Sequence, residues 1–374
     1  MNRLLTFTQS LGFLTLLLVS CEQSITPQPY PPEVESTIPI VDSTPSPLSP
    51  TPSYTGEPPT PAIQSLPGPA YETLFQIPVG PDGIRYTGLS IPNALAVLPD
   101  GTLIIADPTD NRLLYYNAEG NLLSEIDLYS LEIVNVTDLV ATPNELYLLE
   151  ISYNVAPVRF RVSRLTFDGD LIAQYDIPEG YRWDDGLYGF GPVDDESEII
   201  LEFYGERFRF YRLADAQGTN PGELTSISLF GRSYQVIFGN FNEPRINPAI
   251  FIDELKVESQ VTLNGLIKIL AVNPDRSFYV IREDLVSDSP ALQGDITVHY
   301  LSAFGNQLGV ARYPLSEWFS FVQRQVAVGP DGDVYALLPR QETVDILRLN
   351  FYLNIEPLIS GAVEPYVGKS EIQP

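Results

Sequence analysis

The chain has 374 residues, 44% of them hydrophobic and 11% aromatic, which is enough for one large core or two ordinary domains. It carries 48 Asp and Glu against 21 Lys and Arg, and this formal net charge of −27 argues against nucleic acid or anionic lipid headgroups as partners. One cysteine and one histidine exclude an internal disulfide and a zinc site built from those residues.

Residues 1–20 are typical of a secretory signal peptide. Arg3 supplies the positive start, and the apolar run that follows is too short for a transmembrane helix. The run ends in Leu-Val-Ser-Cys at residues 18–21, which resembles a bacterial lipobox. The resemblance implies that Cys21 is lipidated and anchors an extracytoplasmic protein to a bilayer, either the cell membrane or the outer membrane. A plain signal peptide with an incidental cysteine is the alternative.

Residues 21–70 predict a disordered stalk behind the lipidated cysteine. Fourteen prolines fall between Pro27 and Pro69, mixed with Ser, Thr and Glu. Proline removes backbone donors and fixes φ, and the few apolar residues cannot drive folding. We therefore expect an extended linker that is dispensable for folding, followed by a folded domain over residues 71–374.

From residue 72 onward, short β-rich runs alternate with turn residues, and no long stretch has helical periodicity. Four segments repeat one pattern of apolar strand, Pro-Asp-Gly-like turn and second apolar strand, and a fifth copy is weaker. The turn prolines are Pro99, Pro143, Pro192, Pro274 and Pro330. Successive intervals are 44, 49, 82 and 56 residues, so the interval of 82 fits two units, one of them degenerate between about 232 and 264.

Each unit continues into two more short strands, and four-stranded units of this length are typical of propeller blades. The sequence therefore predicts an all-β fold, a six-bladed β-propeller preceded by the stalk. The run Thr73–Ile77 is expected to complete the last blade beside Leu347–Leu349, which would close the ring and leave no open edge. A two-domain β protein is the alternative.

The copy over residues 93–127 carries a further likeness. Its Pro-Asp-Gly, Ala-Asp, Asn-Arg-Leu and Glu-Gly-Asn motifs resemble an NHL-type repeat and the blades of gluconolactonase-like propellers. Such propellers include enzymes, scaffolds and binding domains, so the resemblance implies a fold more than a function. Gluconolactonase-like enzymes hold a divalent cation, commonly calcium, in the central channel, and the oxygen donors that we consider here are Asp107, Glu150, Asp184 and Asp185. Asp107 also fits a simple turn role at a strand end.

In this fold the Pro-Asp-Gly turns lie at one end of the ring, and the opposite end is the mouth where ligands usually bind. The loops that we expect at the mouth are Asp107–Arg112, Asp127–Thr137, Pro178–Gly186, Arg282–Asp295 and Tyr313–Gln325. Two of these loops carry aromatic side chains near acids, and the predicted ligand-binding residues are Tyr181, Trp183, Asp184, Asp185 and Trp318. Aromatic rings beside carboxylates suit sugars or cationic ligands. The alternative is that the rings fill junctions between blades.

Catalytic signals are sparse. There is no Gly-x-Ser-x-Gly motif, and His299 lies in the alternating run Thr-Val-His-Tyr-Leu, which predicts an ordinary strand histidine. We therefore expect a monomeric, non-enzymatic binding or scaffold module for a protein or glycan, with no catalytic residues and no cofactor other than, in the alternative, calcium. That alternative is a calcium-dependent lactonase or related hydrolase. A quinone-dependent dehydrogenase is disfavoured, because the chain has one His and three Lys.

Overall fold

The computed structural model describes residues 68–81, 83–86, 91–152, 159–179, 181, 187–192, 198–203, 209–214, 222–224, 226–237, 249–253, 255–258, 266–287, 293–315 and 324–353. The chain divides into two units, residues 1–57 and 58–374, and all described residues belong to the second. Within these ranges the only helix is the 3-10 turn η1 (Tyr129–Leu131), and no helix is long and apolar enough to cross a membrane.

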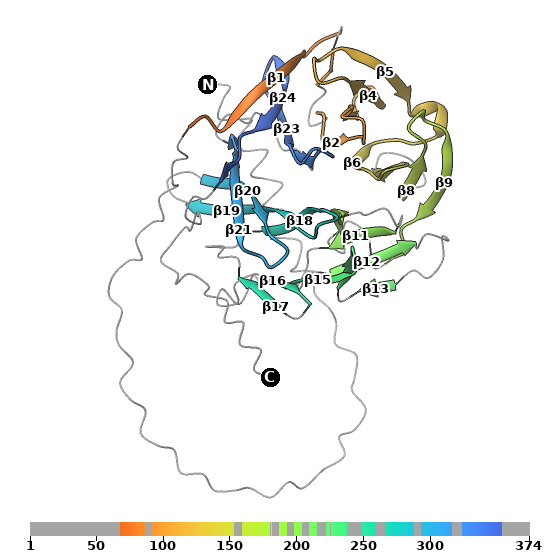
Figure 1. The fold of residues 1–374 in the computed structure, drawn as a ribbon. Helices are drawn as coiled ribbons and strands as arrows, with labels where there is room; N and C mark the ends of the chain where they lie inside the picture. Colours follow the sequence, from red (N-terminus) through yellow and green to blue (C-terminus); the bar gives the residue numbers. More distant parts are fainter. Residues whose placement is uncertain are drawn as a thin grey trace, which may run out of the picture. The chain divides into compact units, whose positions relative to one another are not determined.

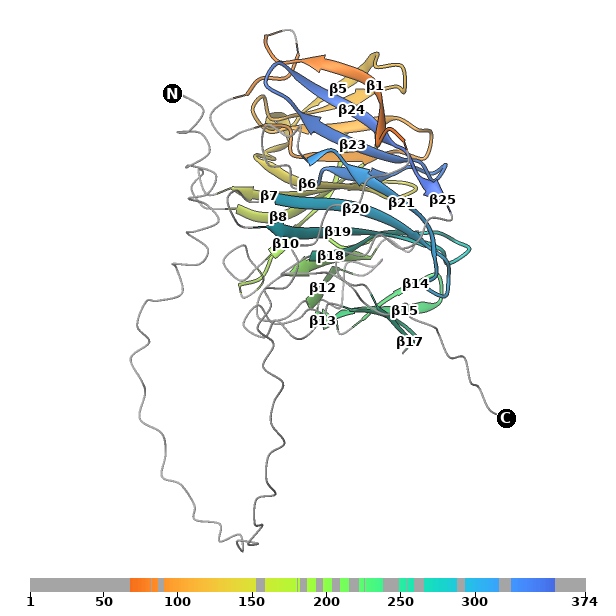
Figure 2. The ribbon, with the colours of Figure 1, turned by 90° about the vertical axis from the view of Figure 1, so that its left-hand side faces the viewer.

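The second unit is an all-β propeller of six antiparallel sheets, as predicted (Figures 1 and 2). Blade I contains β2 (Ala94–Val97), β3 (Leu103–Asp107), β4 (Arg112–Tyr116) and β5 (Leu122–Asp127). Blade II contains β6 (Val136–Ala141), β7 (Leu146–Ser152), β8 (Arg159–Leu165) and β9 (Leu171–Asp176). Blade III contains β10 (Leu187–Phe190), β11 (Ile199–Phe203), β12 (Arg209–Ala214) and β13 (Gly222–Leu224).

Blades IV to VI complete the ring. Blade IV contains β14 (Ile227–Leu229), β15 (Arg232–Ile237), β16 (Ala249–Ile252) and β17 (Leu255–Glu258). Blade V contains β18 (Leu266–Val272), β19 (Phe278–Ser287), β20 (Gln293–Leu301), β21 (Gln307–Tyr313) and β25 (Tyr352–Leu353). Blade VI contains β22 (Val326–Val328), β23 (Val334–Pro339), β24 (Thr343–Leu349) and β1 (Tyr71–Pro78). Blade IV is the degenerate unit that the interval of 82 residues predicted.

The ring is closed by strands from both ends of the described chain. β1 pairs with β24 as the outer strand of blade VI, with Tyr71 opposite Leu349 and Thr73 opposite Leu347, which confirms the predicted closure. The C-terminal strand β25 was not predicted, and it adds a fifth strand to blade V beside β21. Its Tyr352 hydroxyl also donates to the Pro69 carbonyl oxygen at 2.7 Å. The residues that lead into β1 are therefore held by β25.

The Pro-Asp-Gly turns join the first and second strands of their blades, as predicted. In blades I, V and VI the turn aspartate accepts a hydrogen bond from the backbone N–H two residues later, for Asp100, Asp275 and Asp331 at 2.9, 2.9 and 3.0 Å. Gly101 and Gly332 adopt positive φ, which an Asp-Gly turn requires. This repeated local chemistry explains why the turns could be found in the sequence.

Neighbouring blades pack face to face through alternating strand residues. Successive residues of a strand point to opposite faces, so Ile104 packs with blade II while Ile105 packs with blade VI. At the outer rim, a glycine in the last hairpin of one blade lies against the outer strand of the preceding blade. A Cβ on Gly120, Gly169 or Gly305 would approach Phe75, Ile126 or Val257 to 2.6, 2.7 or 2.5 Å. Each of these glycines has positive φ, so the rim contact and the turn both require glycine.

One expected mouth loop is shorter than predicted. β19 extends to Ser287 and β20 begins at Gln293, so most of Arg282–Asp295 is strand rather than loop. The sequence continues its β pattern through this stretch, and pairing of nine residue positions across the hairpin carries the strands past the expected loop boundary.

Candidate functional site: a charge cluster on the ring axis

Four charged side chains from four blades meet near the axis of the ring. Asp138 comes from the innermost strand of blade II, Glu202 from β11 of blade III, Lys268 from the innermost strand of blade V, and Arg324 from the residues just before β22. All four residues are buried. We call this group the axial cluster.

The axial cluster lies at the mouth end of the ring. The innermost strands of blades II, V and VI begin at the mouth and end at a Pro-Asp-Gly-type turn. Asp138 and Lys268 are the third residues of β6 and β18, and Arg324 precedes β22 by two residues. Glu202 is the last residue but one of β11, which runs back toward the mouth. The cluster therefore lies at the mouth end of the ring, although its members are far apart in the sequence.

Asp138 and Arg324 form a bidentate ion pair across the ring. Arg324 Nε and Nη2 donate to the two Asp138 oxygens at 2.5 and 2.9 Å, and Arg324 Nη2 also donates to the Phe190 carbonyl oxygen at 2.9 Å. Phe190 N–H donates to the same carboxylate at 2.7 Å. Burial alone would raise the pKa of Asp138, but Arg324, Lys268 and the Phe190 N–H hold that pKa below its usual range. Asp138 is therefore ionised and fully partnered.

Glu202 and Lys268 form the second pair, which is less completely satisfied. Lys268 Nζ lies 3.1 Å from Glu202 Oε2, and the exposed fractions of the two side chains are 9% and 0%. Neither Glu202 oxygen makes a hydrogen bond of good geometry within the described part of the chain. Burial raises the pKa of Glu202 to about 6, partly opposed by Lys268 and Arg324. Burial also lowers the pKa of Lys268, against the opposing pull of Glu202.

A third carboxylate, Glu283, borders the cluster. It is partly buried on β19, and Gln325 Nε2 donates to its Oε1 at 3.3 Å. Burial raises the pKa of Glu283, opposed by the Gln325 hydrogen bond and by the charge of Lys268. Among the described residues, the mouth end of the axis therefore holds three acids beside Arg324 and Lys268.

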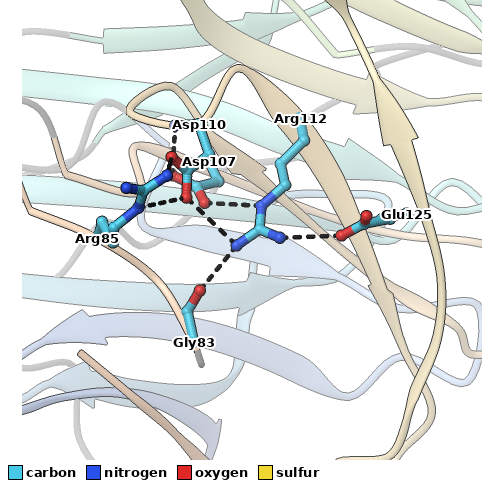
Figure 3. Close-up of polar contacts among 6 residues, drawn as sticks. All are labelled: Gly83, Arg85, Asp107, Asp110, Arg112 and Glu125. Carbon is cyan, nitrogen blue, oxygen red and sulfur yellow. Dashed lines mark hydrogen bonds and ion pairs between the residues drawn. The ribbon is translucent and has the colours of Figure 1, made fainter. Parts of the chain in front are cut away.

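Two of the acids considered as calcium ligands from the sequence, Asp107 and Glu150, lie outside the axial cluster. Figure 3 shows Asp107 at the end of β3, paired with Arg112 Nε at 3.1 Å, while Arg112 Nη2 donates to the Gly83 carbonyl oxygen at 2.7 Å. Arg112 also bonds Glu125 at 2.9 Å. The Asp110 N–H approaches Asp107 Oδ1 at 3.5 Å, consistent with the turn role. This network ties the link between blades VI and I to the strands of blade I.

Blade II repeats that arrangement. Glu150 Oε2 pairs with Arg161 Nη2 at 3.1 Å, and the same Nη2 donates to the Glu132 carbonyl oxygen in the link before the blade at 2.7 Å. Asp107 and Glu150 thus share one structural task, holding an arginine that binds the preceding interblade link.

The described acids do not offer calcium a ligand set. Calcium takes six to eight oxygen ligands, several of them ionised carboxylates. Here Asp138 is occupied by a guanidinium and Glu202 by an ammonium, and no group of three His, Cys, Asp or Glu within the described ranges is arranged to hold a metal. Asp184 and Asp185 fall outside those ranges.

Of the predicted ligand-binding residues, Tyr181 is the one that the structure describes. Its ring lies on Tyr211, with centroids 3.9 Å apart, and meets Phe203 edge-on at 5.5 Å. Its hydroxyl donates to Glu223 at 3.3 Å. Tyr181 thus packs on the core of blade III and fixes the start of its loop. Cys21, Trp183, Asp184, Asp185 and Trp318 lie outside the described residues, and their roles stay predictions.

His299 is a strand histidine, as predicted. It lies buried in β20, where Nδ1 is 2.8 Å from Gln307 Oε1 and Nε2 is 3.0 Å from Thr297 Oγ1. Burial, aided by the nearby Arg282 charge, lowers its pKa to about 4, so the ring is neutral at physiological pH. It is held by neighbours in its own blade and is not part of the axial cluster.

Comparison with known proteins identifies no family for this chain. No family model and no curated protein matches the chain. Similar solved structures include a streptogramin B lyase (13% identity, 76% of this chain and 100% of that chain covered, TM-score 0.40). A gluconolactonase from Xanthomonas campestris (12% identity, 76% and 98% covered, TM-score 0.41) and BamB from Moraxella catarrhalis (11% identity, 72% and 90% covered, TM-score 0.34) are also similar.

Proposed function

We propose that this protein is a membrane-anchored, extracytoplasmic propeller that binds a protein or a glycan at its mouth and does no chemistry there. The observation that carries the proposal is the pairing within the axial cluster. Asp138 and Arg324 satisfy one another, and Lys268 occupies Glu202, so the buried charges on the axis are engaged with each other. Recognition then falls to the loops above them.

The loop that follows Pro178 is the part of the mouth best suited to that task. Tyr181 is anchored on Tyr211 and Phe203. Trp183, Asp184 and Asp185 follow after Arg182 in the sequence. An aromatic ring beside two carboxylates suits sugars or cationic ligands, which favours this segment for recognition.

We expect Trp183→Ala and Trp318→Ala to weaken ligand binding about thirtyfold each, because truncating an aromatic hot spot costs roughly 2 kcal/mol. The full mature chain and both variants are compared on a glycan array and by melting temperature. Phe304→Ala is the matched control, because Phe304 is an aromatic ring, 71% exposed, in the turn between β20 and β21 at the end opposite the mouth.

Two results would contradict this proposal. One is a large loss of stability in the tryptophan variants with unchanged binding per folded molecule, which would make the rings structural. The other is turnover of a lactone by the wild-type chain that disappears in Glu202→Gln, because a carboxyl group with a pKa of about 6 could serve acid–base catalysis.

The proposed membrane anchoring depends on Cys21, which directly follows the apolar run and Val-Ser. We expect Cys21→Ser to release the protein from membranes or to leave an unprocessed precursor, because a soluble chain lacks the acyl groups that hold it. Cell fractionation and the mass of the mature N-terminus measure this. A serine variant that is processed and retained like the wild type would show that something else anchors the chain.

A further inference from the structure

Lys268 is an unusual residue in this chain. It is one of three lysines, and it interrupts the apolar strand Leu-Ile-Lys-Ile-Leu at the innermost position of blade V. Its side chain is 9% exposed, and burying an ammonium is costly unless fixed negative groups surround it. The surroundings of its Nζ atom are therefore informative.

Three carboxylates supply those negative groups. Glu202 Oε2 lies 3.1 Å from Nζ, and the charges of Asp138 and Glu283 also act on the ammonium or are acted on by it. β10 of blade III leaves room for the Lys268 ammonium, because residue 189 in that strand is a glycine. A Cβ at Gly189 would lie 3.8 Å from Nζ and 2.4 Å from Asp138 Oδ2. The Lys268 ammonium and the Asp138 carboxylate thus both lie next to the Gly189 backbone, where no side chain intervenes.

Arg324 cannot neutralise the whole group. Its guanidinium makes two hydrogen bonds with Asp138 and a third with the Phe190 carbonyl oxygen. The charge of Arg324 also lowers the pKa of Glu202, but the group holds three carboxylates, and Lys268 Nζ lies 3.1 Å from Glu202 Oε2 and acts on Glu283 through its charge. A hydrated metal ion would need several oxygens directed at one point, whereas an ammonium needs only separate acceptors around three N–H bonds. Among the described residues, Glu202 Oε2 lies 3.1 Å from Nζ, and Asp138 and Glu283 interact with the ammonium through their charges, which suits an ammonium better than a metal ion.

We infer that the mouth end of the axis is a binding site for a primary ammonium group, and that the protein fills this site with its own Lys268. The lysine acts as a built-in ligand that neutralises the acids of three blades and holds the ring together without a metal. This inference is independent of what the mouth loops bind.

The test is chemical rescue of Lys268→Ala in the full mature chain. The substitution removes three carbons and the ammonium, which n-propylammonium can replace. We expect the variant to melt at least about 5 °C lower than the wild type, since it leaves buried acids without a counter-charge. Millimolar n-propylammonium should restore at least half of that loss, while n-propanol should restore little. Lys256→Ala is the matched control, because Lys256 lies exposed on β17, and neither compound should affect it.

Calcium separates an ammonium site from a metal site. Stabilisation of Lys268→Ala by calcium but not by n-propylammonium would overturn the inference. It would also be overturned if calcium stabilised the wild type as much as the variant, and more than magnesium does. Absence of rescue by either cation would also overturn it. If Lys268→Ala does not fold, its recovery from urea with n-propylammonium, and not with n-propanol, supports the site. Failure of both to promote refolding counts against it.

Lys268→Met gives a second test, because methionine keeps the length and removes the charge. With Lys268 gone, the charges that act on Glu202 are those of Asp138 and Arg324, and the protonated form of Glu202 is favoured still more. A raised carboxyl pKa gives stability that is present at low pH and lost as pH rises through that pKa. Relative to the control variant Lys256→Met, Lys268→Met should therefore lose more stability at pH 8 than at pH 5. An equal loss at both pH values would mean that only packing had changed.

Discussion

Asp138→Ala should destabilise the propeller by about 3–5 kcal/mol, because removal of one partner of a buried ion pair leaves the other charge uncompensated. In this variant Arg324 loses two charge-assisted hydrogen bonds, and the Phe190 N–H loses its acceptor. Urea unfolding of the full mature chain measures the effect. Glu125→Ala is the control, since its carboxylate is 56% exposed in its pair with Arg112 and should contribute at most about 1 kcal/mol.

The double variant Asp138→Leu with Arg324→Met should cost much less than the sum of its single changes. Both charges are then absent, so neither is left buried without a partner. Single changes that each cost less than about 1 kcal/mol would show that the pair is solvated in solution and that the axis is open to water.

Removal of β1 should abolish cooperative folding. A chain that begins at Gly80 lacks the outer strand of blade VI, which contributes Ile77 to the core between blades VI and I and the Gln76 side chain that donates to Asp345 at 2.9 Å. The loss also exposes β24 as a long apolar edge, which favours aggregation. Thermal unfolding monitored by circular dichroism should show no sharp transition.

The control for that truncation begins at Gly68. It keeps β1 and the Pro69 carbonyl oxygen, which accepts hydrogen bonds from Tyr352 and Asn350. Its melting temperature should equal that of the full mature chain. Starting at Tyr71 removes those two hydrogen bonds and should lower the melting temperature slightly. A chain beginning at Gly80 that melts cooperatively near the wild-type temperature would contradict the closure by β1.

The fold could be predicted where its signals are local. Each Pro-Asp-Gly turn carries its own hydrogen-bond pattern within four residues, so the repeat and its spacing were visible. Closure by β1 followed from the need to pair the last edge. Blade IV was visible only as a long interval, because Phe230-Gly231 and Asp253 form its turns in place of the repeated motif. β25 has two residues and no pattern that could have predicted it.

The axial cluster could not be predicted, because its members are joined only by the folded ring. Asp138 and Arg324 are 186 residues apart and belong to no common motif. The one available signal was Lys268, a charge inside an apolar strand. Conversely, Asp107 and Glu150 were candidate calcium ligands only as oxygen donors that the resemblance to gluconolactonase-like propellers suggested, but each pairs with an arginine of the next strand.

If the mouth end of the axis holds one coupled group of charges, Glu202 and Asp138 must respond to one another. The most direct measurement is a titration of the Glu202 carboxyl carbon by nuclear magnetic resonance, in the wild type and in Asp138→Asn. We expect a wild-type pKa of about 6, and a lower pKa in the variant because the competing Asp138 charge is gone while Lys268 and Arg324 remain. A wild-type pKa near the ordinary glutamate value that does not respond to Asp138→Asn would contradict it.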